Sequence, residues 1–255
     1  MKLHATLFSA IALLAAPLSA ISAPDDLSLD DVLAKHYEAR GGLDTIKALK
    51  SYRASGEMTM AGIQAPFVSE AKRPGKLRTE FTLQGMTGIQ AVDGDAGWQV
   101  MPFMGKTDAE PMSEEELRNF KNQADIDGPL VDWKSKGHTV ELVGTEEVEG
   151  ADAYKLKIKL ASGDDIMAYL DAEYFLDLKW DITTTMRGQP VKIGVSFGDY
   201  KEGGELVLPH AMTQTFEGMP GGQIFTIKTY ELNADIADDR FAMPPKAEPA
   251  EVASQ

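Results

Sequence analysis

Residues 67–103 read FVSEAKRPGKLRTEFTLQGMTGIQAVDGDAGWQVMPF. The pattern predicts a four-stranded antiparallel meander, with turns at Pro74-Gly75, near Gly85-Met86 and at Asp93-Gly94. Its third strand alternates in polarity, and successive side chains of a strand point to opposite faces. One face carries Leu77, Thr79, Phe81 and Leu83, and the other carries Arg78, Glu80 and Thr82. The meander therefore has an apolar face, which either closes over a core or stays open to a ligand.

Two short helices are predicted before the meander and one after it. Ser28 begins an N-cap pattern, and apolar residues at helical spacing follow it as far as Gly41-Gly42. A second helix is expected over 43–50. The strand pattern stops between Gly105 and Gly137, where Ser113 begins a capping box. Residues 130–136 are compatible with one or two further helical turns.

Strands without intervening helices fill the rest of the chain. Their expected ranges are 139–143, 154–160, 166–171, 175–184, 191–197, 208–216 and 223–232. Because short turns rather than helices connect them, the sheet should be antiparallel. A first strand starts near Tyr52, so the total is about ten or eleven strands. The fold class is therefore mainly β (α+β), with one domain over residues 24–245.

The first 23 residues have the pattern of a secretory signal peptide: Lys2, an apolar run from Leu7 to Leu18, and small residues before Pro24. The chain contains no cysteine, so neither a lipid-anchored N-terminus nor a disulfide is available. The formal net charge is −15 at pH 7, which disfavours nucleic acid and anionic membranes as partners. We expect a soluble periplasmic protein, with a disordered tail over 246–255.

Motifs for catalysis and metal binding are weak. The sequence Gly194-Val-Ser-Phe-Gly198 matches the pattern of a nucleophile elbow, but no helix is predicted after Ser196. His36, His138 and His210 are scattered along the chain, without the spacing of a zinc site. The Asp93-Gly94-Asp95 sequence favours a hairpin turn over a calcium loop. The sequence therefore predicts no catalytic residue, metal or cofactor.

Methionines are frequent around the meander. They are Met58, Met60, Met86, Met101, Met104 and Met112. One interpretation is ordinary core filling. The other is an adaptable apolar surface for a ligand of irregular shape, which flexible thioethers suit.

Three short motifs, in this order, resemble the lipoprotein-sorting carriers LolA, LolB and LppX. The first is Ala71-Lys-Arg-Pro74 between two strands. The second is Val92-Asp-Gly94 leading through Trp98 to Met101-Pro-Phe103. The third is Arg240-Phe-Ala-Met-Pro-Pro245 at the end. The greater length, the double N-terminal helix and the acidic charge depart from the usual carrier and leave the cargo open.

The resemblance implies an incomplete antiparallel barrel whose mouth is covered by a helical lid formed by residues 28–50 and 113–136. Acyl chains occupy the hollow in such carriers, and the arginine of the K-R-P motif holds the lid shut, which points to Arg73 as the latch. On residues alone, Arg73 is as readily an exposed charge beside a turn. The side chains expected to line the hollow are Met58, Met60, Leu77, Phe81, Leu83, Trp98, Val100, Leu117, Phe120, Leu156, Ile158 and Trp180.

The resemblance thus implies a non-enzymatic carrier of lipoprotein acyl chains or another lipid toward the outer membrane. Its partners would be an inner-membrane donor and an outer-membrane acceptor, and a monomer is expected. The alternative is an envelope sensor on the same fold, like RseB, which binds lipid or polypeptide and signals to a membrane partner. A hydrolase is a distant third.

Overall fold

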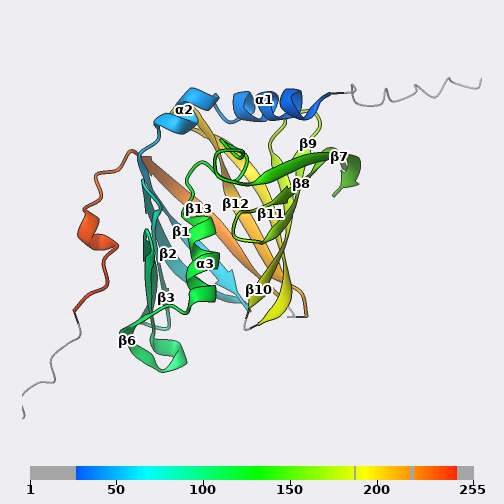
Figure 1. Cartoon of the computed structure of the whole chain (residues 1–255). Helices are drawn as coiled ribbons and strands as arrows, with labels where there is room; N and C mark the ends of the chain where they lie inside the picture. Colours follow the sequence, from blue (N-terminus) through cyan, green and yellow to red (C-terminus); the bar gives the residue numbers. More distant parts are fainter. Residues whose placement is uncertain (1–26, 187, 219–220, 246–255) are drawn as a thin grey trace, which may run out of the picture.

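The computed structural model describes residues 27–186, 188–218 and 221–245, which form one open antiparallel sheet of thirteen strands (Figure 1). The order across the sheet is β6-β5-β4-β3-β2-β1-β13-β12-β11-β10-β9-β8-β7. The first six strands are β1 (Ser51–Met60), β2 (Ile63–Lys72), β3 (Lys76–Leu83), β4 (Met86–Asp93), β5 (Ala96–Met101) and β6 (Lys106–Pro111). The other seven are β7 (Thr139–Val148), β8 (Ala151–Lys159), β9 (Asp165–Asp171), β10 (Asp177–Met186), β11 (Gln189–Gly203), β12 (Leu206–Phe216) and β13 (Gly222–Leu232).

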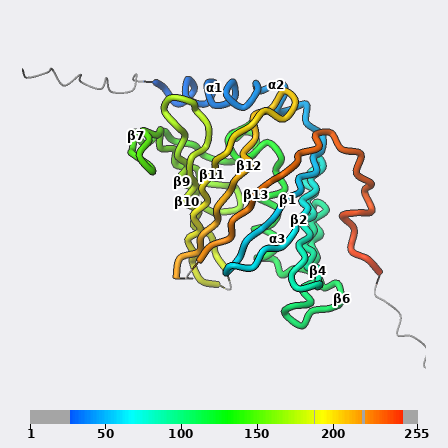
Figure 2. The backbone as a smooth tube through the Cα atoms, turned by 180° about the vertical axis from the view of Figure 1, so that it is seen from behind, coloured from blue at the N-terminus to red at the C-terminus, as the bar shows by residue number. Residues whose placement is uncertain are grey.

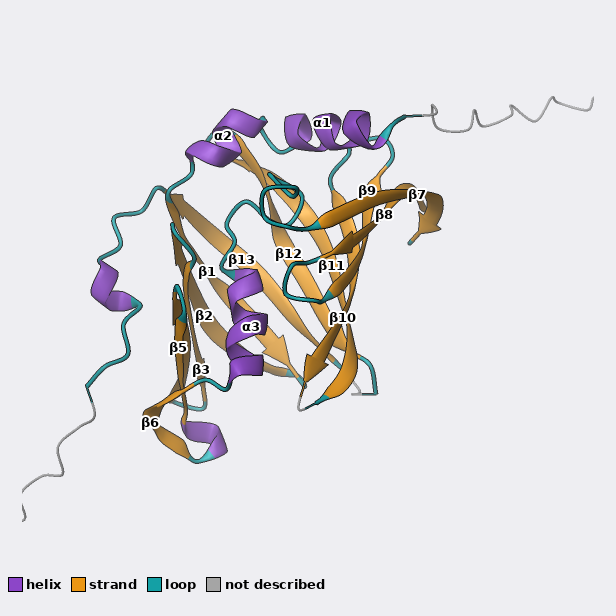
Figure 3. Cartoon of the chain, in the orientation of Figure 1, coloured by secondary structure: helices purple, strands orange, loops and turns teal. Residues whose placement is uncertain are grey.

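Three α-helices cover one end and the hollow of this curved sheet. Helices α1 (Leu29–Ala39) and α2 (Leu43–Ala48) lie across one end, and α3 (Glu114–Gln123) stands in front of the sheet (Figure 3). Capping boxes at Ser28 and Ser113 begin α1 and α3, as expected. Two 3-10 turns, η1 (Pro102–Met104) and η2 (Asp238–Arg240), complete the elements.

The expected fold class is confirmed, although the described sheet has thirteen strands where about ten or eleven were expected, and two local expectations were wrong. Strand β6 lies within the segment where the strand pattern was expected to stop. Its residues are largely exposed at the edge of the sheet, so they lack the apolar alternation that marks a half-buried strand. Residues 130–136 form turns rather than helix. The predicted signal peptide and the predicted disordered tail lie outside the described residues.

The two halves of the sheet meet where β1 pairs with β13. This antiparallel pair joins the N-terminal meander to the C-terminal strands, and Figure 2 shows the continuous curved surface from behind. A β-bulge interrupts the register between Ser55 and Gly56. A Cβ atom on Gly56 would lie 2.0 Å from the backbone oxygen of Thr226, so only glycine fits there.

Pleating and register place most of the apolar side chains on the concave face. On β1, Met58 lies opposite Ala65 of β2 and Phe225 of β13, and the three belong to one apolar cluster. A second cluster packs Val32 and Leu33 of α1 onto β8 and β9. Helix α3 contacts β3, β4 and β5 on one wall and β10 on the other. The concave face is therefore packed under the helices and less covered elsewhere.

Among the described residues, no helix has the length and apolar character needed to cross a membrane.

We expect Gly56→Ala to lower the free energy of unfolding by about 1–3 kcal/mol, because the added methyl group forces β1 away from β13. Gly198→Ala in β11 is the matched control. A Cβ there meets nothing within 4 Å, so the change should be within about 0.5 kcal/mol of neutral. Urea unfolding midpoints of the two variants measure the difference. Equal stabilities would contradict the close approach at this junction.

Candidate functional site

Arg73, at the end of β2, connects the sheet to the helical cover. Its Nε donates to the carbonyl oxygen of Leu49 at 2.6 Å, and Nη2 donates to that of Ile46 at 3.3 Å. Both carbonyls lie at the C-terminal end of α2, where the last carbonyls of a helix need partners beyond its regular ladder. The Ile46 carbonyl also accepts from the backbone N–H of Leu49. The guanidinium also donates hydrogen bonds to both carboxylate oxygens of Asp127, with Nη1 2.7 Å from Oδ2. One side chain therefore ties the sheet to α2 and to the loop after α3.

The pair formed by Arg73 and Asp127 is partly shielded from water. The Asp127 side chain is 9% exposed and the Arg73 side chain 33% exposed. Burial alone would raise the pKa of Asp127, but the hydrogen bonds and charge of Arg73 lower it below its ordinary value. The same contacts raise the pKa of Arg73, mainly through the hydrogen bond to Asp127. Both groups are charged near neutral pH, so the contact is charge-assisted and bidentate.

Other contacts fix the remaining parts of the cover. The imidazole Nδ1 of His36 on α1 lies 2.8 Å from the carbonyl oxygen of Phe175, just before β10. Gly41, with φ 109°, follows α1, and a Cβ there would lie 2.0 Å from the backbone oxygen of Glu205. On α3, Asn119 and Asn122 bond to Thr184 and Asp164 respectively. Each helix is therefore anchored to the C-terminal half of the sheet or to its turns.

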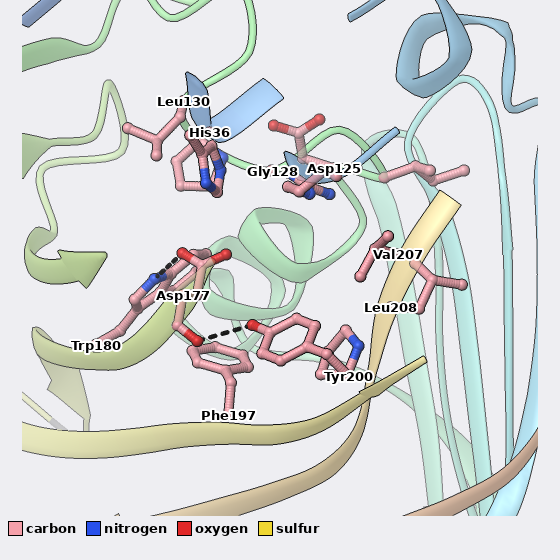
Figure 4. Close-up of a pocket in the computed structure, with 14 residues that line it drawn as sticks. His36, Asp125, Gly128, Leu130, Asp177, Trp180, Phe197, Tyr200, Val207 and Leu208 are labelled. Carbon is pink, nitrogen blue, oxygen red and sulfur yellow. Dashed lines mark hydrogen bonds between the residues drawn. The ribbon is translucent and has the colours of Figure 1, made fainter. Parts of the chain in front are cut away.

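A cavity of about 150 Å³ lies between this cover and the sheet (Figure 4). Its roof comes from α1 and from the loop after α3, and its floor comes from β10, β11 and β12. The apolar part of its wall includes Leu130, Trp180, Phe197 and Leu208. The cavity therefore lies where the cover meets the apolar side of the sheet.

Buried polar groups also face this cavity. Asp177 is 9% exposed, and its Oδ1 accepts a hydrogen bond from the indole Nε1 of Trp180 at 2.8 Å. The phenol of Tyr200 donates to the backbone carbonyl of Asp177 at 2.8 Å. Burial strongly raises the pKa of Tyr200, so the phenol stays protonated and continues to donate. His36 is 1% exposed; burial lowers its pKa, while Asp177 acts in the opposite direction.

Away from the cavity, the concave face leaves large apolar side chains half-exposed. These residues surround the buried cluster around Met58 and Phe67. They are Met60, Phe81, Phe103, Met212 and Phe225. Phe67 packs edge-to-face on Phe225, with ring centroids 5.5 Å apart. The surface is therefore apolar, ordered and partly open to a ligand.

Solved structures share this architecture. A LolA superfamily protein from Nitrosomonas europaea matches with a TM-score of 0.57 at 12% identity, over 85% of this chain and 98% of that one. The fold is LolA-like. A domain from Vibrio parahaemolyticus, named for outer membrane lipoprotein sorting, has a TM-score of 0.55 at 14% identity, over 82% and 94% of the two chains. A DUF1329 family protein from Desulfovibrio piger has a TM-score of 0.57 at 12% identity, over 81% and 95%.

No model of a protein family matches the sequence, and no curated protein matches it. At such low identities the structural likeness establishes the fold alone. The expected LolA-like half-barrel with a helical lid is thus confirmed, and the activity must be argued from the site.

The side chains predicted to line the hollow fall into three groups in this LolA-like fold. Six are buried in packed clusters: Met58, Leu77, Leu83, Phe120, Leu156 and Ile158. Four are half-buried around the concave face: Met60, Phe81, Leu117 and Trp180. Of these twelve predicted residues, Trp180 lines the cavity.

Trp98 and Val100 point to the opposite face of the sheet. Trp98 lies opposite Ala91, whose other neighbour is Arg78, and all three share the convex side. There the indole of Trp98 donates to the carbonyl oxygen of Phe241 at 2.8 Å. The C-terminal segment covers this side, and Phe241 is fully buried. The prediction that Trp98 and Val100 line the hollow was therefore wrong, because the strand alternation places them behind the sheet.

Sequence reasoning missed the polar part of the cavity. Asp177 and Tyr200 were not singled out. His36 falls on the apolar face of the first predicted helix, which favours a core or boundary residue over a ligand, and its burial agrees. The sequence offers one weak signal, an acid directly before the alternating segment 178–183. The methionines divide between roles: Met58, Met101 and Met112 are buried, Met60 is half-exposed, and Met86 and Met104 are exposed.

A larger groove of about 470 Å³ lies by the β4–β5 turn, between the segment leading into α3 and the C-terminal residues 241–243. It includes Trp98 and adjoins the convex side of the sheet. The groove also includes Leu117 of α3, and its lining shares no residue with that of the cavity in Figure 4.

The structure also shows where the nucleophile-elbow pattern Gly194-Val-Ser-Phe-Gly198 lies. Ser196 lies inside β11 with no helix after it, and its hydroxyl is 3.4 Å from Glu149 Oε1. The geometry of a nucleophile elbow, a sharp turn from strand to helix, is therefore missing at Ser196. Among the described residues, no group of three or more His, Cys, Asp or Glu side chains is arranged to hold a metal ion.

We expect a double-mutant cycle of Arg73→Leu and Asp127→Asn to give a coupling free energy of about 1–3 kcal/mol in unfolding. The expected coupling free energy is modest because the Arg73 side chain is one-third exposed and water screens its charge. The control pair is Lys47 and Asp132, which also joins α2 to the loop after α3 but has side chains 41% and 48% exposed. Its coupling should be about 0.5 kcal/mol or less. Equal couplings would contradict a special role for Arg73 in holding the cover.

Acidification should weaken the fold through His36. Because burial lowers the pKa of His36 in the folded state, protons bind more readily to the unfolded chain. The free energy of unfolding should therefore fall as the pH drops below about 6.5, toward the lower folded pKa. His36→Asn can still donate to Phe175 but does not titrate, so its urea midpoint should fall less between pH 7.5 and 5.5. Identical pH dependence in both proteins would contradict this account.

Proposed function

We propose that the chain is a non-enzymatic carrier that binds the acyl chains of a lipid or lipoprotein on the concave face of its half-barrel. The half-exposed apolar side chains between β1, β3, β12 and β13 carry this proposal. A rigid sheet that leaves large apolar groups open beside a helical cover is suited to taking up an apolar ligand. The neighbour named for lipoprotein sorting supports the same class of cargo.

The energetics fit a carrier. Each buried methylene contributes about 0.8 kcal/mol, so an acyl chain of roughly fifteen carbons contributes about 12 kcal/mol before the costs of association. Such a ligand is released at a useful rate only if another state of the protein competes for the same apolar surface. A cover that closes over this surface provides that competition.

Arg73 is the proposed latch of this cover. Its contacts with Ile46, Leu49 and Asp127 favour the closed arrangement seen in the structure. A few charge-assisted hydrogen bonds bias an equilibrium by about 1.5–3 kcal/mol each without making it irreversible. Ligand entry would break these contacts, and their return would favour release.

The predicted signal peptide supports a periplasmic location for the proposed carrier, where an inner-membrane donor and an outer-membrane acceptor would be its partners. The acidic net charge of −15 favours a soluble carrier that does not adhere to anionic membranes. An envelope sensor on the same fold remains the alternative. A sensor would co-purify with a membrane receptor, whereas a carrier would co-purify with lipid.

We expect mass spectrometry of the protein purified from a bacterial periplasm to detect a bound acyl lipid. Phe225→Asp places a charge on the open apolar face and should abolish lipid recovery, whereas the exposed Lys228→Asp on the same strand should not. Thermal melts must show both variants folded. Recovery of a membrane receptor without lipid would favour the sensor and contradict the carrier.

Arg73→Leu should remain folded but bind lipid more tightly and release it more slowly, because the closed cover competes less well. The expected gain in affinity is about tenfold or more, from the loss of one to several charge-assisted bonds. Transfer of a fluorescent acyl probe to acceptor vesicles, measured per folded molecule, gives the rate. A sharp loss of thermal stability with an unchanged transfer rate would contradict the latch.

A further inference from the structure

The cavity under α1 contains a pair of hydrogen-bond acceptors with defined directions. His36 Nδ1 lies 2.8 Å from the carbonyl oxygen of Phe175, so this nitrogen carries the ring proton and donates. The other nitrogen, Nε2, is then an acceptor when the ring is neutral. Within the part of the chain that the structure describes, no protein group donates to it. His36 is 1% exposed, and its ring lies at the cavity wall (Figure 4).

Asp177 supplies the second acceptor. One carboxylate oxygen accepts from Trp180, and Figure 4 shows the other on the side away from that indole, below His36. The backbone of Asp177 is held by the hydroxyl of Tyr200. Asp177 is thus held at one carboxylate oxygen and at its backbone carbonyl, and its remaining carboxylate oxygen is presented to the cavity. Two acceptors in one small cavity call for a ligand that brings two donors.

Arg40 and Asp125 are the charged residues at the rim of the cavity. Arg40 donates to the carbonyl oxygen of Asp127 at 3.3 Å, and Asp125 is paired with Lys136 at 2.6 Å. An anionic head group placed between His36 and Asp177 would face the carboxylate of Asp177, and Asp125 adds a second carboxylate at the rim. Repulsion and the cost of burying the extra charge both disfavour such a head group.

The volume limits the size of the head group. A cavity of about 150 Å³ is comparable with an engineered cavity that holds one benzene molecule, which has six heavy atoms. It is too small for a complete acyl chain. The wall formed by Trp180 and Phe197, whose rings meet edge-to-face at 5.3 Å, belongs to the apolar side of the sheet. A ligand with its polar end here can continue along that side.

We propose that this cavity is the head-group subsite of the carrier, and that it selects an amphiphile with a small uncharged head bearing two hydroxyl donors, such as a monoacylglycerol. The inference rests on the proposed function and adds the chemistry of the ligand's polar end. His36 and Asp177 accept the hydroxyl protons, and Trp180 and Phe197 contact the first methylenes.

Three ligands of one chain length test the proposal with the full chain in titration calorimetry. They are monolaurin, propyl laurate, which has the same three-carbon backbone without hydroxyls, and laurate, which is anionic. Monolaurin should bind about tenfold or more tightly than the other two. Equal affinities would overturn the head-group subsite and leave the carrier intact. The absence of binding by all three would overturn the carrier itself, and the subsite with it.

Matched substitutions test which residues cause the preference for monolaurin over propyl laurate. Asp177→Asn keeps an oxygen for Trp180 but turns the free acceptor into a donor, so the preference for monolaurin over propyl laurate should fall about tenfold. Asp181→Asn, on the same strand and paired with Lys179 instead, should leave the preference unchanged. His36→Asn keeps the bond to Phe175 and should reduce the preference while propyl laurate binds as before. A preference that survives both cavity substitutions would overturn the assignment.

Discussion

The pairing of β1 with β13 is the constraint on which the rest of this structure depends. These strands are more than 160 residues apart in the chain where Met60 meets Gln223, yet they join two meanders into one curved sheet. Without this junction, the N-terminal meander and the C-terminal strands would be two separate antiparallel sheets. The bulge at Gly56 and the close approach of Thr226 allow the two halves to meet as one surface, which supplies the hollow.

The hollow has different properties along its length. Under α1, packed clusters and buried polar groups leave a small cavity. Near β1, β12 and β13, large apolar side chains stay half-exposed. Arg73 lies at the boundary, since it directly follows β2 and its side chain binds the cover. The same sheet can thus offer a polar end, an apolar track and a releasable cover, which together describe an amphiphile carrier.

Local patterns predicted much of the fold because they report on water exposure along one strand or helix. The alternation of Tyr154, Leu156 and Ile158 with lysines identified β8, and the capping boxes identified the starts of α1 and α3. The edge strand β6 was missed because its side chains are largely exposed on both faces, so they need not alternate between apolar and polar. Trp98 and Val100 were assigned to the wrong face, because alternation says which residues share a face but not which face lines the hollow.

The sequence by itself determined the antiparallel class, the order of elements and Arg73 as a position of interest. These follow from short-range periodicity, turn residues and three resembling motifs. Only the tertiary structure brought Asp127 to Arg73 and His36 to Asp177, since those residues are 54 and 141 positions apart. Polar side chains that meet across such distances leave no periodic trace, because their contacts exist only when the sheet has curved and the helices have closed over it.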